Sequence, residues 1–185
     1  MMPHFEKKQS EQEIFKGKVF RVTVDEALLE NGKLARREVV HHHGGACVAA
    51  ITPEKEIYMV RQFRYSFGEE LWELPAGKLE PNEDPLEAAK RELEEETGIT
   101  AQNYFDLGVL YPTVGFCTEK IYTWAATDLK ATQQHLDEDE FLSVYKVPLK
   151  KAVEMVLSGE IRDSKTAVAV LKLDQLIQSG TLVVK

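Results

Sequence analysis

Residues 77–99 read GKLEPNEDPLEAAKRELEEETGI, which places seven glutamates and one aspartate among only three cations. Asp84, Pro85 and Glu87 have the residue types of a helix N-cap, first position and third position. Gly98 has the residue type that ends a helix in the left-handed conformation. The segment therefore predicts a loop followed by a helix that stops at this glycine.

Two faces of the predicted helix differ in character. Apolar residues at spacings of three and four form the face that packs on the core, namely Leu86, Ala89 and Leu93. Carboxylates at i, i+3 and i+4 gather on a neighbouring face, namely Glu92, Glu95 and Glu96. Like charges at i,i+4 cost an isolated helix about 0.2–0.5 kcal/mol per pair, and Arg91 offsets only part of this repulsion.

A divalent cation would remove the conflict between these carboxylates. Mg²⁺ prefers hard oxygen ligands, takes one or two carboxylates, and completes its shell with water and substrate phosphates. The alternative is a solvated helix face, but the lysines that usually alternate on such a face are nearly absent. The spacing therefore favours a magnesium site without naming a reaction.

Length and charge limit the classes of partner. A chain of 185 residues suits one well-cored domain with a small appendage, and its formal charge of −8 argues against nucleic acid or an anionic membrane as the main partner. No apolar run reaches the length of a bilayer span, and no secretory signal follows Met1. Cys47 and Cys117 fit no metal spacing and suit a reducing compartment, so we expect a cytoplasmic protein.

Strand-like runs on either side of Asn31–Gly32 predict a β-hairpin near the N-terminus. We assign residues 1–43 to an antiparallel β appendage and residues 44–185 to the main domain. Within the main domain, strands are predicted over 45–52, 56–65, 104–112, 120–127 and 141–147, a loop over 70–77, and helices over 148–159 and 163–178. Asp163 or Ser164 is predicted to cap the last helix. This order predicts an α/β (α+β) fold, a mixed β-sheet sandwiched between helices, rather than a parallel βαβ series.

Gly77, five residues, Glu83, seven residues and then RELEEETGI resembles the signature of the Nudix hydrolases at every specified position. The resemblance implies the Nudix fold, with a loop–helix–loop that holds Mg²⁺ or Mn²⁺, two or more ions per site, against the diphosphate of a small nucleoside diphosphate substrate. The implied metal ligands are the Ala76 carbonyl, Glu92 and Glu96, with Glu83 serving a further ion. The implied catalytic residues are Glu95, beside the ligands, and Arg91, which orients the carboxylates.

The extended N-terminus and the flanking motifs, such as VRQFRY and DSKTAVAV, resemble the bacterial ADP-ribose pyrophosphatases of that family. That resemblance implies a homodimer with exchanged N-terminal strands. It also implies a set of substrate-binding residues, namely Arg37, Arg64, Glu73 and Glu119. Phe15 or Phe20 would stack on adenine. One departure is Thr113-Val114-Gly115, where relatives often have Ser-Pro-Gly, and it weakens the assignment of ADP-ribose as substrate.

The acidic loop HLDEDEF, residues 135–141, is where relatives place a catalytic glutamate. A glutamate that binds metal directly is a poor proton acceptor, whereas a mobile loop can close over substrate. We predict Glu138 as the general base, with Glu140 as the alternative. At most two of His41 to His43 could share a metal ion, because adjacent strand residues point to opposite faces, and with no cysteine nearby in the sequence we expect no metal site there.

Three functions are compatible with these patterns. The first is hydrolysis of ADP-ribose to AMP and ribose 5-phosphate, and the second is hydrolysis of another nucleoside diphosphate sugar or conjugate. The third is a Nudix fold kept as a ligand-sensing module. Sensors of that kind tend to lose the glutamates and gain a DNA-binding domain, whereas this chain keeps the glutamates and shows no helix-turn-helix pattern.

Overall fold

The structure, a computed structural model, describes residues 4–184 and divides the chain into two compact units. The N-terminal unit runs to Gly44 and also contains the loop Tyr111–Lys120, while the main unit contains the rest of the chain. The loop was not predicted to join the appendage. Its attachment is made by backbone hydrogen bonds to one strand, from Val40 N to Phe116 O (2.7 Å) and from Thr118 N to Val40 O (2.9 Å).

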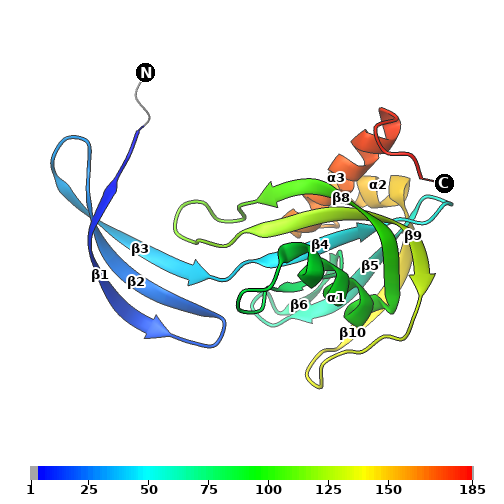
Figure 1. Cartoon of the computed structure of the whole chain (residues 1–185), viewed down its shortest axis with the longest axis horizontal. Helices are drawn as coiled ribbons and strands as arrows, with labels where there is room; N and C mark the ends of the chain where they lie inside the picture. Colours follow the sequence, from blue (N-terminus) through cyan, green and yellow to red (C-terminus); the bar gives the residue numbers. More distant parts are fainter. Residues whose placement is uncertain (1–3, 185) are drawn as a thin grey trace. The chain divides into compact units, whose positions relative to one another are not determined.

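The N-terminal unit is an antiparallel sheet in the order β1 (Lys7–Lys16), β2 (Phe20–Leu28) and β3 (Leu34–His42) (Figure 1). The predicted hairpin is confirmed, and Gly32 has the positive φ (76°) that its turn requires. Strand β1 was not predicted. All ten of its residues are exposed, so its sequence carries no alternation of apolar and polar side chains.

The main unit contains two sheets (Figure 1). The first is mixed and has the order β7 (Ala76–Lys78), β4 (Gly45–Ala50), β9 (Ile121–Ala131) and β8 (Ile99–Leu110), with β4 and β9 parallel. The second is antiparallel, with β10 (Leu142–Pro148), β5 (Glu56–Arg64) and β6 (Glu69–Glu73). The prediction of a loop over residues 70–77 was wrong in part, because β6 pairs with β5 and β7 pairs with β4.

Helices cover both sides of β4, whose alternate residues enter two different cores. Helix α1 (Pro85–Thr97) packs on Ala46, Val48 and Ala50. The intervening residues of β4 face the core that contains side chains of α2 (Leu149–Ser158) and α3 (Ser164–Gln178). The predicted sandwich is confirmed. None of the helices within residues 4–184 has the length and apolar character needed to cross a membrane.

The ends of α1 follow the local chemistry of the sequence. The Asp84 carboxylate accepts hydrogen bonds from the Leu86 and Glu87 amides at 2.9 and 3.3 Å. Gly98 has φ of 65°, and its amide donates to the Glu94 carbonyl at 2.8 Å. At α3, Asp163 rather than Ser164 is the N-cap.

Candidate active site

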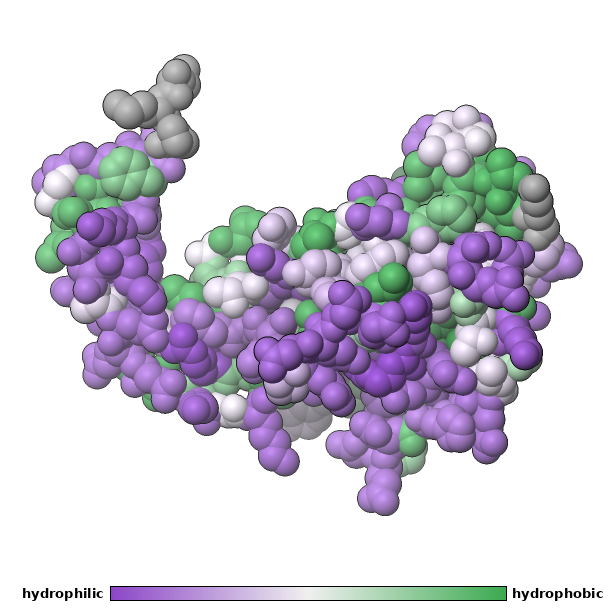
Figure 2. Space-filling view, in the orientation of Figure 1, coloured by the Kyte–Doolittle hydropathy of each residue, from purple (hydrophilic) through white to green (hydrophobic). Residues whose placement is uncertain are grey.

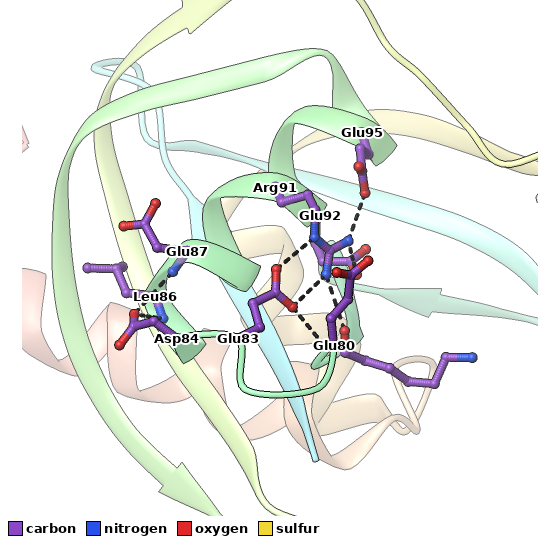
Figure 3. A network of polar contacts seen from close by, with 9 residues as sticks. Glu80, Glu83, Asp84, Leu86, Glu87, Arg91, Glu92 and Glu95 are labelled. Atoms are coloured by element: carbon purple, nitrogen blue, oxygen red, sulfur yellow. Dashed lines mark hydrogen bonds and ion pairs between the residues drawn. The ribbon is translucent and has the colours of Figure 1, made fainter. Parts of the chain in front are cut away.

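Arg91 is the centre of a hydrogen-bonded group of glutamates on and before α1 (Figure 3). Its Nε and Nη2 donate to the two oxygens of Glu83 at 2.9 and 3.1 Å. Its Nη1 donates to Glu92 Oε1 at 2.8 Å and to Glu95 Oε2 at 2.9 Å. One guanidinium thus balances three carboxylates, and the hydrogen bonds that Arg91 donates to Glu83 are the largest cause that raises the pKa of Arg91.

Glu83, which the resemblance implied as a ligand for a further ion, is held by Arg91 in this structure. Its Oε2 also accepts the Glu80 amide at 2.8 Å. The hydrogen bonds from Arg91 lower the pKa of Glu83, so its carboxylate stays charged. In this arrangement Glu83 ties the loop before α1 to the middle of the helix.

Glu92 and Glu96 are the buried carboxylates of the site, 8% and 2% exposed. Glu96 Oε2 accepts the Ala76 amide at 3.0 Å. Burial raises the pKa of Glu96 to about 8; the Ala76 amide opposes this shift, and the charges of Glu92 and Glu140 add to it. Burial also raises the pKa of Glu92, and Arg91 opposes that shift. Burial disfavours the charged form of both carboxylates, and a bound cation would favour it. The pair is therefore suited to binding a cation.

Gly77 allows β7 to approach the Glu92 side chain closely. A Cβ atom at this position would lie 1.9 Å from Glu92 Oε1 and 2.1 Å from its Cδ. On its other side, a Cβ on Gly45 would lie 2.7 Å from the Gly77 carbonyl oxygen. Glycine at both positions therefore lets β4, β7 and the acidic face of α1 meet.

The donor set fits a magnesium or manganese ion. Within residues 4–184 no three His, Cys, Asp or Glu side chains converge closely enough to hold a metal by themselves. Mg²⁺ needs only one or two carboxylates, since water and phosphate oxygens complete its octahedral shell. The carboxylates of Glu92 and Glu96 supply hard oxygen ligands, and the Ala76 amide holds Glu96 against the backbone of β7.

The acidic loop is attached to the C-terminal end of α1. The Thr132 and His135 amides donate to the Gly98 and Glu95 carbonyls at 2.7 and 3.0 Å. The Gln134 side chain donates to the Glu96 carbonyl at 2.6 Å. Of the two predicted bases, Glu138 is exposed, while Glu140 is half-buried and its charge contributes to the raised pKa of both Glu92 and Glu96.

Two of the predicted substrate-binding residues, Arg64 and Glu73, bind each other. The Nε and Nη2 atoms of Arg64 donate to the two Glu73 oxygens at 2.5 and 2.6 Å. Glu73 is almost fully buried, and Lys165 Nζ donates to it at 2.5 Å. Burial would raise the pKa of Glu73, but the two cations outweigh it, and the pKa lies below its ordinary value.

Lys165 was missed in the sequence. A signal was present, because a lysine in the first turn of a helix lies at the positive end of the helix dipole. Such a residue needs an anionic partner from elsewhere in the fold, and here it has Glu73 and the cap residue Asp163.

The other two predicted substrate-binding residues belong to the N-terminal unit. Arg37 donates to the Glu6 carboxylate at 2.9 and 2.7 Å. Glu119 lies 3.5 Å from His42 Nδ1. His41 hydrogen-bonds Thr23 at 2.9 Å, which is a structural role.

The two aromatic residues considered for adenine stacking are also in the N-terminal unit. Phe15 and Phe20 lie against each other, with ring centroids 5.7 Å apart, and both remain substantially exposed.

The chain is similar in sequence and in fold to several known proteins. The model of the NUDIX domain matches residues 41–169. The chain is 42% identical over 178 residues to the ADP-ribose pyrophosphatase of Bacillus subtilis (strain 168), covering 94% of this chain and 96% of that protein. It is 41% identical over 167 residues to the methanol dehydrogenase activator of Bacillus methanolicus, covering 89% and 90%. A crystal structure of an ADP compounds hydrolase shares the fold, with a TM-score of 0.80 and 20% identity over 96% of this chain and 97% of that one.

Gly77→Ala is predicted to disturb metal binding without unfolding the protein. The new methyl group displaces the Glu92 carboxylate, which is the far end of a flexible side chain and can move. We expect the Mg²⁺ concentration for half-maximal activity to rise about 10–100-fold, with the melting temperature nearly unchanged. Gly115→Ala is the matched control, because no atom lies within 4 Å of its added Cβ. An unchanged Mg²⁺ requirement in Gly77→Ala would contradict the prediction.

Glu96→Gln is predicted to stabilise the metal-free protein at alkaline pH. The pKa of Glu96 rises from its ordinary 4.5 to about 8 on folding. Between these values the folded state keeps a proton that the unfolded chain has lost, so this group lowers the free energy of unfolding as pH rises. The shift is about 3.5 units and one pKa unit corresponds to about 1.4 kcal/mol, so the substitution should stabilise by up to about 5 kcal/mol at about pH 8.5 and have little effect near pH 4.5. Urea denaturation in EDTA across this range measures it, and a destabilised variant at the higher pH refutes it.

Proposed function

The chain belongs to the Nudix family, and we propose that it hydrolyses the diphosphate bond of ADP-ribose to AMP and ribose 5-phosphate in the presence of Mg²⁺. The observation that carries the proposal is the buried pair Glu92 and Glu96 beside Ala76, within a complete family signature. The end-to-end similarity to an ADP-ribose pyrophosphatase supports the choice of substrate. Mn²⁺ is the alternative ion, and we propose two or more ions per site.

A second candidate is hydrolysis of another nucleoside diphosphate sugar or conjugate. Thr113-Val114-Gly115 favours it, because these residues replace the Ser-Pro-Gly expected for an ADP-ribose enzyme. A ligand-sensing role is not proposed, since every glutamate of the signature is present. A cytoplasmic location is consistent with Cys47 and Cys117, which are both free thiols.

In the proposed reaction the side chains have separate tasks. Glu92, Glu96 and the Ala76 carbonyl hold the ions, which when bound lower the pKa of water and neutralise charge on phosphoryl oxygens. Arg91 holds Glu92 and Glu95 in place by donating a hydrogen bond to each carboxylate. Arg64, 39% exposed at its side chain, presents positive charge to the diphosphate. Arg37 and Glu119 are proposed to contact substrate from the N-terminal unit.

A substrate panel tests this proposal directly. The protein is incubated with ADP-ribose, ADP-glucose, GDP-mannose and NADH, each with Mg²⁺, Mn²⁺ or EDTA, and the products are separated chromatographically. We expect AMP and ribose 5-phosphate in equal amounts from ADP-ribose, and no turnover in EDTA. Preferential cleavage of a nucleotide sugar supports the second candidate, and no cleavage of any compound refutes both.

Glu96→Gln is predicted to lower kcat by orders of magnitude, because a neutral amide is a poor ligand for Mg²⁺. Glu94→Gln is the matched control: it lies on the same helix, outside the specified positions of the signature, and is only half-buried. Near-normal rates for Glu96→Gln at saturating Mg²⁺ would show that Glu96 is not a ligand.

We propose Glu138 as the general base, carried over substrate by the loop anchored to the end of α1. Glu138→Gln should lower kcat by about 10²–10⁴-fold, with the Mg²⁺ requirement unchanged and the loss shrinking as hydroxide increases with pH. Glu140→Gln is compared in parallel, because Glu140 has the electrostatic contact with Glu92 and Glu96. If Glu138→Gln keeps wild-type kcat and Glu140→Gln does not, the role belongs to Glu140.

We further propose that the protein is a homodimer built through exchanged N-terminal strands. The described part of the N-terminal unit has little core of its own, since Ala27 is its only fully buried apolar side chain. Large apolar side chains are instead exposed on it, namely Phe5, Ile14, Phe15, Val19, Phe20 and Leu34. A small sheet with so much exposed apolar surface needs a covering partner.

Light scattering at micromolar concentration tests the dimer. We expect a dimer for the natural sequence and a shift toward monomer for Ile14→Glu, which places a charge on the exposed strand β1. Leu157→Glu is the matched control, because Leu157 is 75% exposed on α2 of the main unit. If the natural sequence is monomeric at every concentration tested, the proposal is wrong. If the Ile14→Glu dimer is as stable as that of the natural sequence, the interface does not include β1.

A further inference from the structure

Four buried or half-buried charges connect the start of α3 to the strand that carries Arg64. Lys165 Nζ lies 2.5 Å from Glu73 Oε2 and 3.0 Å from Asp163 Oδ2. The exposed fractions of the Lys165 and Glu73 side chains are only 13% and 2%. Replacing a buried ion pair with apolar side chains of similar size is often neutral or stabilising. Stability alone therefore does not explain why the Lys165–Glu73 pair is present.

The geometry of Glu73 shows what the network holds. Both Glu73 oxygens accept from Arg64, so the guanidinium is fixed in plane by a bidentate contact. Within the described residues, Arg64 Nη1 donates to no protein acceptor. The Nε and Nη2 atoms of Arg64 are therefore bound to Glu73, and Nη1 is free to donate to a ligand. Lys165 shares the negative charge of Glu73, so the carboxylate does not cancel the charge of Arg64 completely.

The same end of α3 also fixes the backbone that leads to the glutamates of α1. The Leu74 amide donates to the fully buried hydroxyl of Thr166 at 2.8 Å. That hydroxyl in turn donates to Asp163 at 2.6 Å. Two residues further along, the Ala76 amide donates to Glu96 at 3.0 Å. Residues 73–76 thus join the Arg64 clamp to the proposed metal ligands, with α3 as their common support.

We propose that Lys165 is a positioning residue for substrate binding, which acts through Glu73 to hold the Arg64 guanidinium toward the diphosphate. Glu73 is accordingly a positioning residue too, and not a direct substrate contact as the resemblance implied. The inference rests on the proposed function, in that it takes the anion bound by Arg64 to be the substrate diphosphate. Lys165 itself does not touch substrate, because Glu73 and Asp163 occupy its ammonium group.

A double-mutant cycle separates positioning from a merely structural role. Lys165→Met should raise KM for the nucleoside diphosphate substrate about tenfold, with a smaller effect on kcat and none on the Mg²⁺ requirement. In an Arg64→Ala background the same substitution should change KM less than about twofold, because the group through which it acts is gone. Lys172→Met is the matched control on α3, since Lys172 donates to the Leu107 carbonyl outside the network. Equal effects of Lys165→Met in both backgrounds overturn the proposal.

A second measurement does not depend on turnover. The Nε–H signal of Arg64 in ¹⁵N NMR, assigned from its loss in Arg64→Ala, should be protected from solvent exchange in the natural sequence. It should lose that protection in Lys165→Met, or in Lys165→Gln if the first variant does not fold, and keep it in Lys172→Met. Unchanged protection overturns the proposal. If no nucleoside diphosphate is hydrolysed but the protection is lost, the proposed function fails while the positioning of Arg64 by Lys165 stands.

Discussion

One guanidinium shared by three carboxylates is the interaction on which the site depends. Without Arg91, the carboxylates of Glu83, Glu92 and Glu95 would face one another with no cation among them. With it, the loop from β7 is tied to the middle of α1, and two of the acidic side chains point in fixed directions. Glu96, one turn beyond Glu92, is outside the reach of Arg91 and keeps only the Ala76 amide. The site thus contains carboxylates that are paired with Arg91 and one, Glu96, that is not. A cation is needed beside Glu96.

The small side chains of the mixed sheet allow the helices to pack close to it. Along β4, alanines alternate between the core under α1 and the core under α3, and each brings a helix close to the strand. Gly45 and Gly77 allow equally close packing at the edge of the sheet, where a Cβ atom at either position would clash with a neighbouring residue. Figure 2 shows the opposite character on the outside of α1, where the surface is hydrophilic. The apolar cluster between α1 and β4 therefore lies beneath a hydrophilic outer surface, and the larger core lies on the other side of β4.

The sequence predicted those features that rest on local chemistry. Asp84 and Gly98 mark the ends of α1 because a cap acts within one turn. The hairpin at Asn31–Gly32 and the acidic face of α1 are local in the same sense. Strand β1 escaped prediction because it has no buried side and hence no alternation. Lys165 escaped because its partner Glu73 lies 92 residues away, and only the fold brings the two together.

The parallel pairing of β4 with β9 has a consequence for how the protein folds. Gly45 pairs with Ile121, and β5, β6, β7, α1 and β8 all lie in the connection between the two strands. Arg64, Arg91 and the acidic signature are therefore carried inside one long crossover. Contacts between residues so distant in sequence form slowly, because the entropy of closing the connection opposes them until other contacts have formed. During synthesis, the apolar surface on which α1 packs cannot be complete until the chain has passed β9, which contributes Ala126 to it. The apolar face of the acidic helix therefore stays partly uncovered until a strand has formed that contributes no residue to the proposed site.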